Sequence, residues 1–172
     1  MSSISELESG MKGLAMDNSD SLRQHLANLL TKASAHVEAT TELKEFPAQL
    51  RGRKPEGAPY TPWQVLEHMR IAQWDILRFS MDSKHVSPKF PDGYWPKTAA
   101  PPSDAAWEGS VRQFLADLKE LSALVQDKKR DLFAPIPHGD GQTLLREALV
   151  VADHNSYHLG QLVLLRRTLS GK

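Results

Sequence analysis

Apolar residues recur every three to four positions over four long stretches of the chain, the spacing typical of amphipathic helices. Residues 143–169 form the longest of these stretches. Its apolar positions are Leu144, Leu145, Ala148, Val151, Ala152, Leu159, Leu162, Val163 and Leu165. This pattern predicts one long helix near the end of the sequence, with one face turned toward the core.

Two further helices have clear start signals. Thr61 followed by Pro62 supplies a hydroxyl N-cap and a proline at the first helical position, and the apolar pattern behind them reaches Met81. The next pattern begins at Ser103 or Asp104 and runs to about residue 126. Both stretches therefore predict helices of about 20 residues.

The first helix is expected to start at Asp20 or Ser21, behind a polar leader that we expect to be flexible, residues 1–19. Its predicted buried stripe comprises Leu22, Leu26, Leu29, Leu30, Ala33 and Val37. Phe46 and Pro47 end this helical region. Residues 20–172 then form one domain, a length that suits a single continuous core.

The connection between the second and third helices, residues 82–102, contains six prolines or glycines and cannot be helical throughout. It also holds Phe90, Tyr94 and Trp95, which we expect to cover one end of the domain. Four long helices, no strand-like alternation and one long connection predict an all-α fold. The specific expectation is a four-helix bundle with a long crossover between helices 2 and 3.

Two histidines lie within the apolar pattern of the last helix. His154 and His158 are four residues apart, so they lie on one helix face about 6 Å apart along the axis. Two imidazoles in this arrangement can bind one metal ion. They can equally form a metal-free polar cluster whose ring nitrogens bond to carbonyl or carboxylate oxygens.

His68 is the third candidate ligand, because it lies beside the apolar face of the second helix. Asp75, two turns further on, has the best phase for a carboxylate that orients the His68 ring. Glu67 and Asp153 fit ordinary surface positions better. His138 lies in the connection before the last helix, where an exposed loop histidine is expected in preference to an alternative ligand.

Composition excludes several classes of function. The chain has 21 basic and 21 acidic residues, so nothing indicates nucleic acid or an anionic membrane as a partner. It has no cysteine, which excludes disulfides and a cysteine zinc site and fits a cytoplasmic protein. We see no secretory signal and no apolar run long enough to span a membrane.

The phrases WQVLEHMRIAQWDIL (residues 63–77) and ADHNSYHLGQLVLLRR (residues 152–167) closely resemble the DinB-like (DinB/YfiT-like) superfamily of metal-binding four-helix bundle proteins. The resemblance runs from about Leu22 to Leu169 and includes PHGDGQTLLREAL before the last helix. It implies a metal held by His68, His154 and His158. We expect a divalent ion, zinc or nickel before iron or manganese, since imidazole nitrogen suits several of these metals.

The resemblance implies two further properties. Relatives include S-transferases that use low-molecular-weight thiols, an isomerase and metal-dependent hydrolases, so the expected partner is a small-molecule substrate, with such a thiol as one candidate. Relatives also commonly form homodimers. The competing hypothesis is a non-catalytic, metal-stabilised helical module that binds a ligand or a second copy. The residues themselves do not identify the substrate or a catalytic side chain.

Overall fold

The computed structural model describes residues 18–32 and 34–171. Its elements are the α-helices α2 (Asn18–Thr31), α3 (Ala39–Lys44), α4 (Pro62–Met81), α5 (Asp104–Gln126) and α6 (Leu144–Ser170), and the single-turn 3-10 helices η1 (Ala48–Leu50) and η2 (Asp92–Tyr94). The described residues contain no strand, only a lone bridge between Pro135 and Thr143. The prediction of an all-α fold is confirmed.

The ends of the long helices follow the signals in the sequence. Thr61 and Gln64 form a reciprocal capping box at the start of α4. The hydroxyls of Ser103 and Thr143 accept hydrogen bonds from backbone N–H groups in the first turns of α5 and α6. Gly171 ends α6 in the left-handed region, with a φ of 68°, which glycine adopts without strain.

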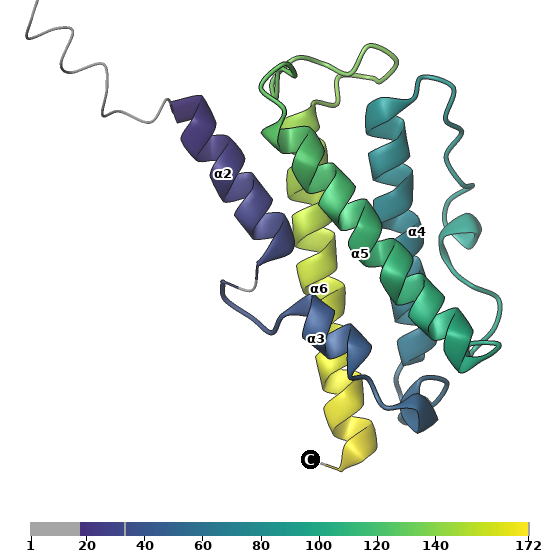
Figure 1. Ribbon diagram of the computed structural model, residues 1–172. Coiled ribbons are helices and arrows are strands. Elements are labelled where there is room, and N and C mark those ends of the chain that lie inside the picture. Colours follow the sequence, from purple (N-terminus) through teal and green to yellow (C-terminus); the bar gives the residue numbers. More distant parts are fainter. Residues whose placement is uncertain (1–17, 33, 172) are drawn as a thin grey trace, which may run out of the picture.

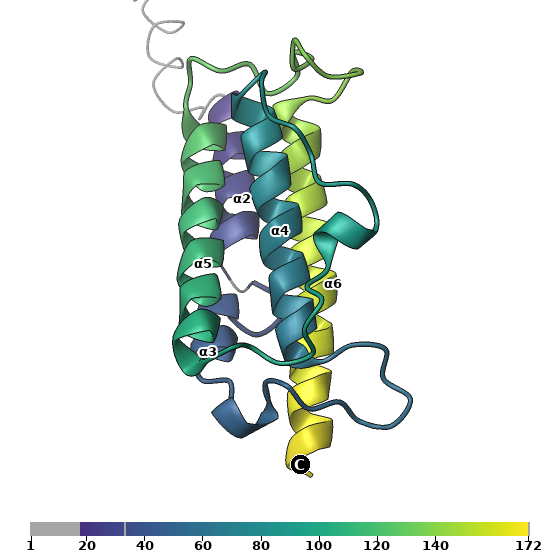
Figure 2. The same cartoon turned by 90° about the vertical axis from the view of Figure 1, so that its right-hand side faces the viewer.

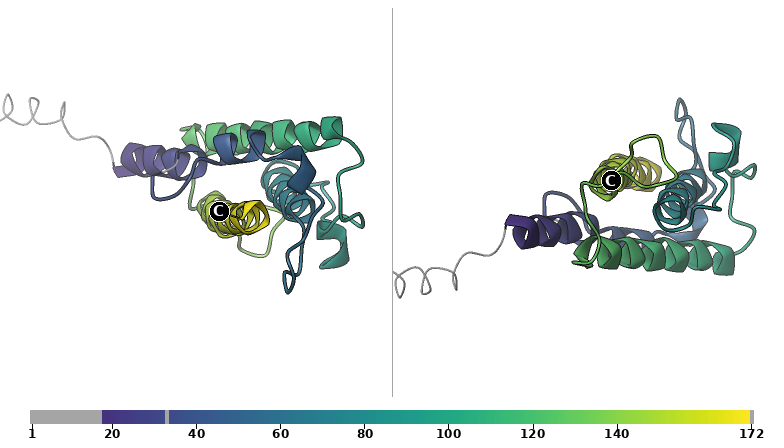
Figure 3. Two further views of the ribbon diagram at one scale, coloured as in Figure 1. Left: turned by 90° about the horizontal axis from the view of Figure 1, so that it is seen from below. Right: turned by 90° about the horizontal axis from the view of Figure 1, so that it is seen from above.

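The four longer helices pack around one core (Figure 1). α4 packs against both α5 and α6, and α2 packs against the same two helices. The views along the long axis show α5 lying across one side of the α4–α6 pair (Figure 3). The largest fully buried side chains come from several of these elements and include Trp107, Phe46, Phe114, Leu66, Met69 and Leu162. The core is therefore shared by the whole described domain.

The prediction of one continuous first helix is wrong. α2 ends at Thr31, and the chain does not become helical again until Ala39. Leu29 and Val37, which belong to the predicted buried stripe, are 49% and 38% exposed. Ala33 and the leader up to residue 17 lie outside the described residues.

The break allows the end of this region to pack on α5. Leu43 and Phe46 are almost fully buried, and the ring centroids of Phe46 and Trp107 are 5.3 Å apart. The indole N–H of Trp107 also donates to the carbonyl oxygen of Leu43, at 3.1 Å. No proline or glycine marks the break between α2 and α3, so the periodicity of the sequence could not indicate it.

The connection from residue 82 to residue 103 runs along the outer side of α4 (Figure 2). Its single helical turn, η2, packs against α4. We expected Phe90 to cover one end of the domain, but it is 77% exposed.

None of the described helices is long and apolar enough to cross a membrane.

A buried arginine joins the first helix to the end of α5. The guanidinium of Arg23 donates to the carbonyl oxygens of Val125 at 2.8 Å, Asp127 at 3.1 Å and Arg130 at 2.5 Å. The last carbonyls of a helix have no intrahelical partner and carry partial negative charge. Arg23 therefore caps α5 from a neighbouring helix.

Replacing Arg23 with methionine should lower the free energy of unfolding by about 2–3 kcal/mol, because buried carbonyls lose charged donors. Urea denaturation followed by circular dichroism measures this change. Arg112→Met is the matched control: its side chain is 72% exposed and it makes one 3.9 Å ion pair. That control should change stability by no more than about 0.5 kcal/mol. Equal losses in the two variants would contradict a capping role for Arg23.

Candidate metal centre

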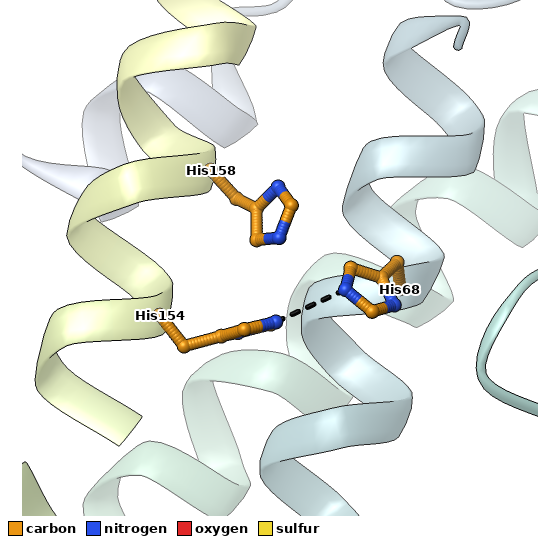
Figure 4. A group of neighbouring side chains, drawn as sticks. All are labelled: His68, His154 and His158. Atoms are coloured by element: carbon orange, nitrogen blue, oxygen red, sulfur yellow. Dashed lines mark hydrogen bonds between the residues drawn. The ribbon is translucent and has the colours of Figure 1, made fainter. Parts of the chain in front are cut away.

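The three predicted ligands lie together between α4 and α6 (Figure 4). His68 comes from α4, and His154 and His158 come from successive turns of α6. The ring centroids of these histidines are 4.5 to 4.9 Å apart. Their candidate ligand atoms all lie within 4.8 Å of one another. Two residues four apart on one helix and one on its neighbour thus form a compact imidazole cluster.

Hydrogen bonds to oxygen acceptors orient two of the three rings. Nδ1 of His68 bonds the carbonyl oxygen of Tyr94 at 3.0 Å, and Nδ1 of His158 bonds the amide oxygen of Gln161 at 2.8 Å. Both partners accept hydrogen bonds only, so each Nδ1 carries the proton. Nε2 of both rings is then unprotonated and available to a metal.

The spacing of the nitrogen atoms suits a single small ion. Nε2 of His154 and Nε2 of His68 share a hydrogen bond of 3.0 Å (Figure 4), in which His154 donates because His68 carries its proton on Nδ1. Two imidazole nitrogens that bind one tetrahedral zinc ion at ~2.05 Å are ~3.3 Å apart. This pair is therefore close to the separation that one shared ion requires, and His158 has a candidate ligand atom within 4.8 Å of both.

The surroundings of the cluster favour these neutral imidazoles. Burial lowers the pKa of His68, partly offset by its bond to Tyr94. Burial also lowers the pKa of His158. The pKa of His154 falls to about 4, first because the ring is buried and second because the two other histidines disfavour another positive charge. Neutral imidazole is the form that binds metal, so at neutral pH the three rings need not lose a proton before they bind an ion.

An aromatic stack covers the His68 ring. Trp95 lies parallel to His68, with the ring centroids 3.9 Å apart and an angle of 3° between the rings. Tyr60 stacks on the other face of Trp95, also at 3.9 Å. We expected the crossover aromatics to cover one end of the domain, but Trp95 instead covers the histidines, midway along α4 and α6. The stack shields this side of the cluster from water.

Asp75 does not contact a candidate ligand. Its two carboxylate oxygens bond Nε2 of His85 at 2.7 Å and the hydroxyl of Tyr94 at 2.6 Å. Burial and the Asp75 carboxylate raise the pKa of Tyr94 to about 12. The predicted carboxylate is therefore linked to His68 indirectly, through Tyr94.

Three partners in the site were not anticipated from the sequence. Gln161 follows His158 by three residues on the same helix, a spacing that could have indicated the contact. His85 lies in the irregular crossover, where no periodicity places a side chain. Tyr94 contributes its backbone carbonyl, which any residue carries, so no sequence signal exists for it.

The remaining candidates lie elsewhere. His138 is exposed and bonds the carbonyl oxygen of Phe79 at 2.7 Å, as a loop histidine should. Asp153 is exposed. Glu67 is 8% exposed and pairs with Arg70, so it is not the surface charge expected. None of these three candidates belongs to the histidine cluster.

The rest of the seam between α4 and α6 is hollowed on both sides of the histidines. An apolar cavity of about 240 Å³ is lined by Ala58, Pro59, Tyr60, Val65, Gln161, Leu164 and Leu165. A second cavity of about 180 Å³ is lined by Asp75, Ile76, Phe79, Ser87, Gln142, Arg146 and Glu147. α4 and α6 are antiparallel along this seam. Val65 near the start of α4 lines the same cavity as Leu165 near the end of α6, whereas Phe79 near the end of α4 lines the same cavity as Arg146 near the start of α6.

Comparison with protein-family models settles the family. The model described as the DinB superfamily matches residues 25–162, most of the chain. The protein belongs to the DinB superfamily. A search of curated proteins and a search of solved structures each found no significant match. The matched range of this DinB protein includes all three histidines of the cluster.

The lowered pKa of His154 predicts how the stability of the metal-free protein depends on pH. The unfolded chain takes up a proton near pH 6.5, whereas the folded chain does so only near pH 4. Stability should therefore be full above about pH 7 and should fall as the pH drops from 6.5 toward 4. Thermal unfolding with a chelator present measures this loss.

His154→Gln should reduce that pH-dependent loss, because the variant lacks the group that resists protonation. His138→Gln, which changes an exposed histidine, should keep the full loss. Parallel pH profiles for the wild type and His154→Gln would contradict the assignment.

Proposed function

We propose that this DinB protein binds one divalent metal ion through His68, His154 and His158 and acts as a metal-dependent enzyme on a small molecule. The scaffold would be a four-helix bundle whose crossover covers the site. The observation that carries the proposal is the orientation of the rings. Three imidazoles converge while the Nδ1 atoms of two of them are held by oxygen acceptors. This is the arrangement that protein metal sites use to present Nε2.

The reaction we propose is of the thiol S-transferase or hydrolase type. A divalent ion with three protein ligands keeps a position for an exogenous group and lowers the pKa of a thiol or water bound there. Zinc and nickel are the favoured ions, and iron or manganese are the alternatives. The chain has no cysteine, so a thiol would have to come from the substrate.

The protein's own residues would orient and shield the reacting group. Gln161 and the carbonyl of Tyr94 hold two ligand rings in place. Trp95 and Tyr60 exclude water from one side. The cavities on the α4–α6 seam supply an apolar surface toward Leu165 and a more polar one toward Arg146. A small molecule with one apolar and one polar end suits this seam.

A second candidate function is a non-catalytic, metal-stabilised module that dimerises. It is favoured by exposed apolar residues at seven-residue spacing on α6, namely Val150, Tyr157 and Leu164. Such a stripe on one helix face is typical of helix-to-helix contacts between copies. A homodimer and a cytoplasmic location are compatible with both candidate functions.

Elemental analysis of purified, tag-free protein tests metal binding. We expect about one divalent ion per chain in the wild type and its loss in His68→Ala, His154→Ala and His158→Ala, since three imidazoles share the ion. His138→Ala, at an exposed histidine of the same chain, should retain the metal. A wild type that remains metal-free after reconstitution with zinc or nickel would contradict the proposal.

A thiol titration separates the two candidate functions. In cobalt-substituted protein, a cysteine-derived thiol should produce a thiolate-to-cobalt charge-transfer band, because the position beside the histidines accepts an exogenous ligand. The corresponding alcohol is the control and should produce no such band. Metal that raises the melting temperature while the thiol leaves the spectrum unchanged would favour the non-catalytic module.

A further inference from the structure

The crossover is attached to α4 through one buried carboxylate. Asp75 is 7% exposed and lies about two turns after His68 on α4. Its Oδ1 bonds His85 near the start of the crossover, and its Oδ2 bonds Tyr94 nine residues later. Asp75 therefore holds the crossover against the helix at two points.

Tyr94 links this attachment to the histidine cluster. Its hydroxyl donates to Asp75, and its backbone carbonyl accepts the Nδ1 proton of His68. The next residue, Trp95, stacks on the same imidazole. Any shift of the crossover away from α4 would thus remove both the hydrogen bond that orients His68 and the ring that covers it.

Asp75 itself is not placed to bind the ion. It follows His68 by seven residues, which corresponds to about 10 Å along the helix axis. Both of its oxygens also have partners, at 2.7 and 2.6 Å. Its effect on the site must pass through Tyr94.

We propose that Asp75 is a positioning residue: by holding Tyr94 and His85 it fixes the crossover over the cluster and thereby sets the orientation of the His68 ring. This inference rests on the proposed metal site. Hydrogen-bond partners of metal-binding histidines typically contribute about 10- to 100-fold to metal affinity. Breaking the Asp75–Tyr94 bond should weaken zinc binding within that range while the three ligands remain.

Two variants test the positioning role. Tyr94→Phe removes only the hydroxyl and keeps the backbone carbonyl, and Asp75→Asn keeps the shape of the side chain but removes its charge. Asp92→Asn, which changes an exposed carboxylate of the same crossover, is the matched control. Zinc affinity is measured by competition with a chromophoric chelator, on proteins whose circular dichroism matches the wild type.

A second measurement follows the crossover directly, without metal. Trypsin can cleave after the exposed residues Lys84, Lys89 and Lys97 of this segment. Cleavage there should be faster in Tyr94→Phe than in Asp92→Asn, because the segment has lost an attachment to α4. If Asp75→Asn fails to fold, Tyr94→Phe alone decides the question.

The outcomes are distinct. Zinc binding weakened about tenfold or more in Tyr94→Phe, with unchanged binding in Asp92→Asn, supports the proposal. Affinity within about twofold of the wild type in both test variants overturns it and leaves the metal site intact. A wild type that binds no zinc overturns the proposed function and this inference together, and the wild-type curve alone identifies that case.

Discussion

The packing of three imidazoles, two buried and one half-buried, into one seam is the constraint on which this structure depends. Each ring loses water when α4 and α6 pack, and each buried nitrogen then needs a partner. Two Nδ1 atoms find theirs in Tyr94 and Gln161. The inward Nε2 atoms face one another, an arrangement in which protonation is disfavoured and a metal ion is a natural shared partner.

The crossover, although irregular, is integral to the site. Its aromatic and polar residues do not simply cover the core: Trp95 stacks on His68, and Tyr94 and His85 bond Asp75. Loops are often the functional part of a domain because a rigid scaffold positions them. Here Asp75 of α4 bonds two residues of the crossover, and the crossover in turn bonds His68 of α4 through the carbonyl oxygen of Tyr94.

Along the seam, the histidine cluster and the cavities are built from different residues. The histidines occupy the middle of α4 and α6, while the cavities on either side differ in polarity. Residues such as Leu164 and Arg146 line these cavities and do not belong to the cluster. They could therefore change without disturbing the three histidines.

The sequence by itself determined the three longest helices, α4, α5 and α6, and the three clustered histidines. Caps such as Thr61 and Ser103 and the apolar period are local signals, and the DinB phrases contain the three histidines. Only the tertiary structure decided the break between α2 and α3, which no residue type marks, and the roles of Tyr94 and His85. A backbone carbonyl and a side chain in an irregular segment acquire partners only through packing, and the periodicity of a sequence contains no information about such contacts.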